Sequence, residues 1–244
     1  MKKTVSLVLA LLMLVAVLSV AGCKPARTVK LGLGSVTSIA RSKDATAEAP
    51  ATAQADTTIV AVILGKDGKI INVSIDAAQT KVAFDADMKV ASDKEAAIES
   101  KKELGFYYGM GASSPIGKEW HEQVAALEEW MIGKTVKEVK NMKLTDRGNP
   151  DVPELTSSVT ISVQDFIAAL DKAAANTVAV KNYSTMGLGI ISSIAGSKDA
   201  TETATAQAQV DTNMSATAFD KNGKSSAQLS TLPKSGYPMM QKAK

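Results

Sequence analysis

The chain contains very few of the residues that build covalent or metal-centred sites. Among its 244 residues there is one cysteine, Cys23, and one histidine, His121. A single cysteine excludes an internal disulfide framework and any site that needs two thiolates. A single histidine leaves no second imidazole for a His-rich zinc site, and His121 is better explained as a partly exposed helix position than as a ligand or proton donor. We therefore predict no metal site, and any redox chemistry would depend on a bound organic cofactor.

An excess of charge of one sign is also lacking, and aromatic residues make up only 4% of the chain. The formal net charge is +3, and removal of Lys2 and Lys3 with the N-terminal segment described next lowers it to about +1. A chain with so little positive charge is not expected to bind nucleic acid. A core built from Val, Ile, Leu and Ala is still possible over more than 200 residues.

The N-terminal segment, residues 1–23 (MKKTVSLVLALLMLVAVLSVAGC), is typical of a secretory signal, with lysines before an apolar run. Its end, LSVAGC, matches the bacterial lipoprotein signal, in which the thiol of Cys23 is acylated and cleavage makes Cys23 the new N-terminus. A single membrane-spanning anchor is the alternative, but the run from Val5 to Val20 is short for a span. Acyl chains contribute about 0.8 kcal/mol per buried methylene. We therefore predict an extracytosolic protein that is lipid-anchored to the cell membrane.

An internal repeat divides the remaining chain. The segment from Gly32 to Lys69 aligns without a gap on the segment from Gly187 to Lys224, a period of 187 − 32 = 155 residues. Because this period is domain-sized, we predict one unit over 30–180 and a truncated second copy over 184–244. Copy two reads SSAQLSTLPKSGY where copy one has the strand-like IINVSIDAAQTKV, and it lacks the alternation of a half-buried strand. We expect this tail to pack poorly or to be disordered, and a truncated or frame-shifted gene is one hypothesis for it.

Local patterns in the first unit predict an α+β fold, an antiparallel sheet with packed helices. Two apolar runs joined by KDGK at 66–69 indicate a β-hairpin, and LGLG at 31–34 indicates an earlier strand rather than a phosphate loop. Helices are expected over 92–106, 113–134, 134–140 and 162–176. Their predicted start signals are Ser92 with Glu95, Pro115 in the first turn, Thr135 with Glu138, and Ser162 as N-cap.

A run of hydroxyl side chains, ELTSSVTISVQDF at 154–166, precedes the last of these helices. Thr160 and Ser162 lie just before a helix start expected at Val163, where backbone N–H groups and the helix dipole favour an anion such as phosphate. A simpler alternative is that Ser162 caps the helix and that the Ser and Thr residues before it form the polar face of a final strand.

The order of hairpin, helices and hydroxyl-rich segment resembles the FMN-binding domain family. That family includes one component of the sodium-pumping NADH:quinone reductase and flavin-carrying bacterial lipoproteins. Its D-x-x-[ST]-G-A-T signature contains a threonine that a dedicated transferase esterifies to the phosphate of FMN. The signature falls on ELTSSVT here, with Glu154 in place of Asp, Ser157 at the Ser/Thr position and Thr160 at the flavin-bearing position. Ser158 and Val159 replace Gly and Ala, which adds bulk beside Thr160.

The resemblance implies FMN as cofactor, bound covalently at Thr160 or non-covalently, with Ser157, Ser158 and Ser162 beside it. It implies a tethered redox carrier that exchanges electrons with partner proteins and needs a flavin transferase, with no catalytic residue and no independent turnover. The alternative is a non-catalytic surface binding or interaction lipoprotein that has lost the cofactor. Four aromatic residues could stack on a planar ring or simply belong to the core: Tyr107, Tyr108, Trp120 and Trp130.

Overall fold

A four-stranded antiparallel sheet forms the centre of the first unit. The computed structural model describes residues 28–231, and the strand order in this sheet is β3-β2-β1-β4. The predicted hairpin is confirmed, with the turn at 65–69 between β2 and β3. The α+β class is therefore correct. The strands are β1 (Val29–Ser38), β2 (Thr52–Leu64), β3 (Ile70–Ala83) and β4 (Thr177–Val180).

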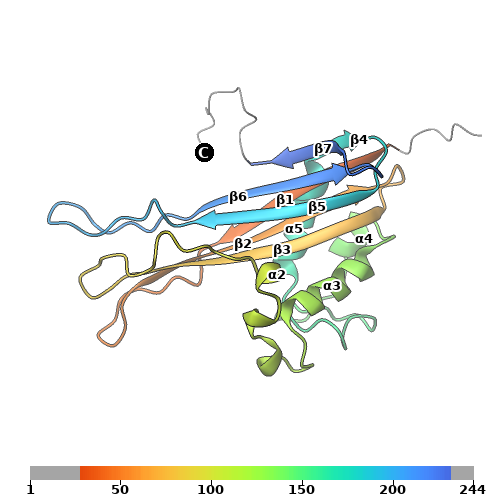
Figure 1. The fold of residues 1–244 in the computed structure, drawn as a ribbon. Helices are drawn as coiled ribbons and strands as arrows, with labels where there is room; N and C mark the ends of the chain where they lie inside the picture. Colours follow the sequence, from red (N-terminus) through yellow and green to blue (C-terminus); the bar gives the residue numbers. More distant parts are fainter. Residues whose placement is uncertain (1–27, 232–244) are drawn as a thin grey trace, which may run out of the picture.

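Helices cover one face of this sheet (Figure 1). The apolar stripe of α3 is buried as predicted, at Trp120, Val124, Leu127 and Met131. α5 lies against β1 at very short range, because a Cβ atom on Gly34 would be 2.3 Å from the Ala169 carbonyl oxygen. The helices are α2 (Lys101–Leu104), α3 (Trp120–Met131), α4 (Val136–Lys140) and α5 (Gln164–Ala175), with 3₁₀ turns η1 (Gly105–Tyr108) and η2 (Gly111–Ser113).

A second, three-stranded antiparallel sheet covers the other face of the first (Figure 1). It reproduces the register of the first sheet at the repeat period: Gly32 pairs with Val62, and Gly187 pairs with Thr217, each 155 residues further on. The shared core between the sheets joins Leu31 and Ile63 of the first to Met214 of the second. Its strands are β5 (Thr185–Ser193), β6 (Asp211–Phe219) and β7 (Ser225–Ser230).

The expectation that the tail after residue 224 packs poorly or is disordered is wrong for its described residues, 225–231. β7 pairs with β6 along its length, and Leu229 packs against the core between the sheets. The helices on one face and the second sheet on the other therefore bury β2 from both sides, which is why Ile59 to Leu64 form an unbroken buried run without alternation. Residues 232–244 lie outside the described residues.

Three predicted helix starts are also wrong. The first helix begins at Lys101 with Ser100 as N-cap, whereas the Ser92 hydroxyl accepts a hydrogen bond from the Ala83 N–H. α3 begins at Trp120, five residues after Pro115. α5 begins at Gln164 with Val163 at the N-cap position, so Ser162 is not a cap. The Thr135 and Glu138 capping box of α4 is confirmed.

Between residues 28 and 231 there is no helix long and apolar enough to cross a membrane. The same described residues contain no group of three or more His, Cys, Asp or Glu side chains arranged to hold a metal ion. The predicted signal segment, residues 1–23, and with it Cys23, lies outside the described residues.

Candidate functional site

The hydroxyl run does not form the strand that its alternating Ser and Thr residues suggested. Residues 153–158 form tight turns instead, in which the N–H groups of Ser158 and Val159 both donate to the Leu155 carbonyl oxygen. Leu155 and Val159 are buried and hold these turns against the helical core. α5 begins at Gln164, four residues after Thr160 and one residue later than predicted, so the positive end of its dipole lies further from Thr160 than expected.

Thr160 is held by a glutamine that sequence reasoning did not single out. The Thr160 N–H donates to Oε1 of Gln123 at 2.8 Å, and its hydroxyl lies 3.3 Å from the same oxygen. Gln123, on α3, is fully buried, and its amide nitrogen donates to the Ser114 hydroxyl and to the Lys118 carbonyl oxygen, each at 3.1 Å. These four hydrogen bonds, two to Oε1 and two from Nε2, form only when the Gln123 amide has this orientation. Gln123 therefore fixes where the Thr160 hydroxyl lies.

A loop from Thr145 to Pro150 holds the segment from its other side. Asn149 donates its side-chain N–H to the Thr160 carbonyl oxygen at 2.8 Å, and the Gly148 carbonyl accepts from the Val163 N–H. Gly148 has a φ of 78° and packs directly on the Ser162 hydroxyl, where a Cβ atom would come within 2.7 Å. Thr160 and Ser162 are thereby positioned on a braced backbone.

The four predicted site residues have different environments. Thr160 is half-buried, whereas Ser157 and Ser162 are exposed. The Ser158 hydroxyl donates to the Leu155 carbonyl oxygen at 3.3 Å and belongs to the turn. Ser162 lines a cavity, but Thr160, Ser157 and Ser158 do not. The structure therefore brings one of the four to a cavity and places Thr160 next to Ile161, which also lines that cavity.

This cavity, which we call the helix-side cavity, lies between the sheet, the α2–α3 region and the start of α5. Its volume is about 370 Å³, within the range of small-molecule sites. It is lined by Ser38, Ala40, Arg41, Asp56, Thr58, Ala77, Ala78, Lys101, Tyr108, Met110, Trp120, Ile161, Ser162, Asp165 and Phe166.

Aromatic rings and one cation dominate one wall of the helix-side cavity. The Lys101 ammonium lies 4.7 Å from the centre of the Tyr108 ring and 5.4 Å from that of Trp120. Trp120 meets Phe166 edge to face, with ring centres 6.0 Å apart. The Tyr108 hydroxyl donates to the Gln79 side chain at 3.3 Å, which fixes the ring. Trp120 and Phe166 are each at most 5% exposed, so this wall offers a planar ligand chiefly the half-buried Tyr108 ring and the positive charge of Lys101.

The rest of the lining carries charges of both signs. Arg41 lies 3.7 Å from the Asp56 carboxylate, which also accepts from the Gln54 amide at 2.9 and 3.0 Å. Asp165, in the first turn of α5, adds a second carboxylate to the lining. The cavity thus holds two cations and two carboxylates. A planar ring with an attached phosphate, such as FMN, would have to place that phosphate near Ser162, Arg41 or Lys101 and away from Asp165.

The sequence offered only a partial signal for this site. Tyr108 and Trp120 were noted as rings that could stack, and both line the cavity. Tyr107 is 94% exposed and Trp130 contributes to the core further along α3. Lys101 could not be found from spacing, because the cation–π geometry exists only after α2 packs beside α3.

His121 is half-buried and is not among the residues that line the cavity. Its ring meets Phe106 edge to face at 4.8 Å, and its Nδ1 atom is buried with no hydrogen-bond partner among the described residues. The described contacts therefore give this imidazole a packing role.

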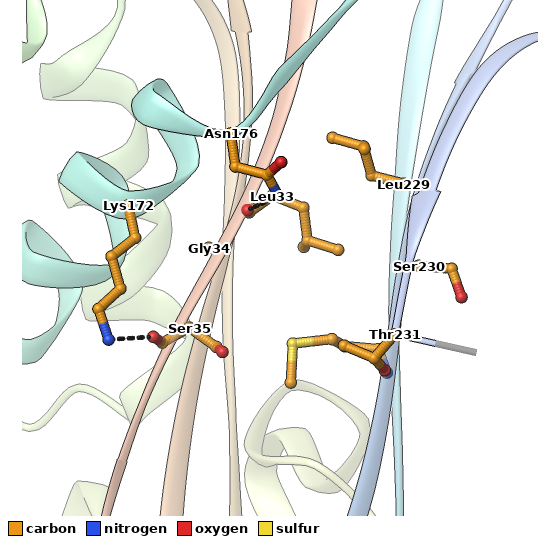
Figure 2. A pocket seen from close by; sticks show the side chains of 9 residues that line it. Leu33, Gly34, Ser35, Lys172, Asn176, Leu229, Ser230 and Thr231 are labelled. Atoms are coloured by element: carbon orange, nitrogen blue, oxygen red, sulfur yellow. Dashed lines mark hydrogen bonds between the residues drawn. The ribbon is translucent and has the colours of Figure 1, made fainter. Parts of the chain in front are cut away.

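A second cavity, also of about 370 Å³, lies between the first sheet, α5 and the second sheet (Figure 2). It follows the part of β1 beyond Gly32, where β4 no longer pairs with it. Lys172 donates to the Ser35 carbonyl oxygen at 3.0 Å and Asn176 donates to the Leu33 carbonyl oxygen at 3.1 Å. These side chains satisfy the open strand edge, so the polar groups from α5 are already engaged in holding the fold.

Comparison with known proteins relates part of the chain to a reductase. No family model matches the chain, and no solved structure matches it. A chlorophenol reductase from Desulfitobacterium hafniense is 32% identical to this chain over 160 residues. The match covers 48% of this chain and 49% of that protein, so the chain spans about half the length of the curated relative.

Proposed function

We propose that this chain is a lipid-anchored extracytosolic protein whose first unit binds FMN in the helix-side cavity and acts as a tethered redox carrier. One observation carries the proposal: aromatic rings, the Lys101 cation and the braced segment that contains Thr160 and Ser162 converge on one cavity of suitable volume. The lipobox that ends at Cys23 supplies the anchor.

Bound FMN would supply one- and two-electron transfer, and the protein would supply position and electrostatics. Tyr108 would cover a planar ring, and the buried Trp120 and Phe166 would help to exclude water. Lys101 places a positive charge against these rings, which stabilises negative charge that arrives with electrons. Gln123 and Asn149 hold the Thr160 backbone and hydroxyl in place at the edge of the cavity.

A covalent link to Thr160 suits this cavity better than phosphate binding alone. The carboxylates of Asp56 and Asp165 oppose the positive charges of Arg41 and Lys101, which weakens binding of a free phosphate. A tether removes the need for a strong anion site. Esterification at Thr160 would remove only its hydroxyl hydrogen bond to Gln123 and leave the N–H bond in place.

The relative named a reductase is consistent with a redox role, and it supports this class of function over hydrolysis or group transfer. Our second candidate is a binding lipoprotein without cofactor. The observations that favour it are the two carboxylates in the cavity and the bulk at Ser158 and Val159, of which Val159 is buried beside Thr160.

The test is to express the full chain with and without a flavin transferase and to measure its mass and visible absorbance before and after denaturation. We expect a flavin adduct that survives denaturation and depends on the transferase. Thr160→Val should abolish the adduct, whereas Ser157→Ala, an exposed hydroxyl three residues earlier, should retain it. Flavin that is released on denaturation would indicate non-covalent binding. Absence of flavin in every sample would leave the binding lipoprotein as the function.

A further inference from the structure

An apolar hollow lies at the end of the sheet where the described chain begins. Its volume is about 600 Å³, and it is lined by Thr28, Val29, Gly65, Lys66, Asp67, Lys69, Ile70, Ile71, Ile132 and Gly133. The β2–β3 turn and the residues after α3 are joined here, because the Ile70 N–H donates to the Lys134 carbonyl and the Gly133 N–H donates to the Ile70 carbonyl, each at 2.8 Å. We call this end of the molecule the anchor-side surface.

Two isoleucines on the anchor-side surface are exposed. Ile71 and Ile132 are 43% and 44% exposed, although isoleucine is among the residues most often buried. Both belong to hydrogen-bonded structure rather than to a loose loop, and the hollow between them is mostly apolar. The folded protein therefore presents a shaped apolar surface with no covering element among residues 28–231.

Positive charge surrounds this apolar hollow. Four lysines lie on or next to the surface and two acidic residues accompany them, a local balance of 4 − 2 = +2: Lys30, Lys66, Lys69 and Lys134 against Asp67 and Glu138. The carboxylate of Glu138 is occupied, because the N–H and the hydroxyl of Thr135 both donate to it at 2.7 Å and lower its pKa. None of these four lysines is in an ion pair between residues 28 and 231, and Lys134 lies over the Trp130 ring, 4.3 Å from its centre.

The distance to the acylated cysteine is short. Only 28 − 23 = 5 residue steps separate Cys23 from Thr28, which span at most about 18 Å when fully extended. Lys24 and Arg27 in this stretch add positive charge, and it contains no acidic residue. Once acyl chains hold Cys23 in the bilayer, the anchor-side surface cannot move far from the lipid headgroups.

We propose that the anchor-side surface docks on the anionic phospholipid surface of the membrane that holds the lipid anchor, with Ile71 and Ile132 at the headgroup level and the lysines on lipid phosphates. This inference rests on the lipid anchor of the proposed function and is independent of the flavin. Each lysine near an anionic bilayer contributes enough to change the ratio of docked to undocked protein about fivefold. Docking fixes which end of the protein faces the membrane.

The test uses the full lipidated chain in vesicles of phosphatidylcholine with or without phosphatidylglycerol. Because acylation consumes the thiol of the single cysteine, a second cysteine can be labelled uniquely with a nitroxide. Asp67→Cys places the label on the β2–β3 turn, and Glu48→Cys places it in the loop between β1 and β2, at the other end of the sheet (Figure 1). Both changes replace an exposed carboxylate. Spin-label collision with lipid-dissolved oxygen and with a water-soluble nickel complex reports the position of each label.

We expect the label at position 67 to be shielded from nickel and exposed to oxygen in anionic vesicles, and the label at position 48 to show the reverse. Lys66→Gln with Lys69→Gln should lower the docked-to-undocked ratio about 25-fold, and Ile71→Ser with Ile132→Ser should also lower it. Lys43→Gln with Lys89→Gln, at the other end, should leave the label at position 67 unchanged.

Three results would overturn the proposal. Equal exposure of both labels on a chain whose mass confirms lipidation would reject docking and leave the lipoprotein assignment intact. A chain without lipid would reject the anchor as well. Spin–spin broadening between labels at position 67 would show that a second copy of the chain covers this surface instead of lipid.

Discussion

Gly34 in β1 and Gly189 in β5 occupy the same position of the repeat, 155 residues apart, but they have different surroundings. A Cβ atom on Gly34 would lie 2.3 Å from the Ala169 carbonyl oxygen and 2.3 Å from the Ala173 nitrogen. A Cβ atom on Gly189 would meet nothing within 4 Å. The same substitution is therefore expected to create a clash at Gly34 and none at Gly189.

The expected cost at Gly34 follows from this geometry. Both contact atoms belong to the backbone of α5, so no side-chain rotation relieves the clash, and the helix must move by about 1 Å to restore van der Waals distance. That movement loosens Phe166 and Leu170, which α5 buries in the core. Overpacking of this kind costs typically 1–3 kcal/mol, and we expect about 3 kcal/mol because the obstacle is rigid. Gly189→Ala should change the free energy of unfolding by less than about 0.5 kcal/mol.

Urea unfolding of the full chain in detergent, followed by circular dichroism, measures both values. For a protein of this size, 3 kcal/mol corresponds to a fall in Tm of roughly 6–12 °C. Equal losses for the two variants, or no loss for Gly34→Ala, would refute the view that this glycine exists to admit α5.

Three further predictions concern single side chains. Burial is the main cause that raises the pKa of Asp76 in the folded protein. The free energy of unfolding should therefore decrease as pH rises from about 4 through the folded pKa, because the carboxylate ionises less easily in the folded state than in the unfolded state. Asp76→Asn should remove this decrease, measured as the pH dependence of the denaturation midpoint. Gln123→Leu should cost about 2–3 kcal/mol, measured by urea unfolding, because it removes a fully buried amide and leaves the half-buried Thr160 N–H without its partner. Thr135→Ala should cost about 1 kcal/mol in the same assay by removing the capping box of α4, and a cost near zero would show that packing alone holds this helix.

Local signals predicted the elements whose residues act on their near neighbours. The KDGK turn, with Gly68 at a φ of 76°, specifies the β2–β3 hairpin through its own backbone geometry. The stripe of α3 and the capping box at Thr135 likewise depend on spacings of three and four residues. These features were visible in the sequence because no distant contact competes with them.

Helix starts were mispredicted where a contact distant in sequence takes up the side chain expected to cap the helix. Both Ser92 with Glu95 and Ser100 with Glu103 have the spacing of a capping box. Ser92 is taken by the Ala83 N–H at the end of β3, whereas Ser100 caps α2 and also donates to the Asp76 carboxylate at 2.8 Å. The same holds for the candidate site, because Gln123 and Thr160 meet only after α3 and the hydroxyl run pack together.

The second copy misled sequence reasoning because only one of its faces is buried. Val73 and Ile75 of β3 pack in the core beneath the helices, and their repeat counterparts in β7 are Gln228 and Ser230. The opposite face keeps small apolar residues such as Ala216, which pack on the first sheet. The face of the second sheet that points away from the first sheet has no helices packed on it, so polar residues are tolerated there. The loss of apolar residues on that face therefore does not indicate failed packing.

The two proposals together constrain where electrons enter and leave. Ser38, in the lining of the helix-side cavity, is nine residues along β1 from Val29 on the anchor-side surface, a distance of about 30 Å in a strand. With that surface docked, the cavity is held well outside the bilayer, so the electron partner should be a protein or solute in the aqueous phase. A water-soluble reductant should therefore reduce the flavin-loaded chain equally fast with or without Lys66→Gln and Lys69→Gln. A reductant confined to the bilayer should act faster on the double variant, because weaker docking lets the cavity approach the membrane; a faster reaction in the parent chain would contradict this orientation.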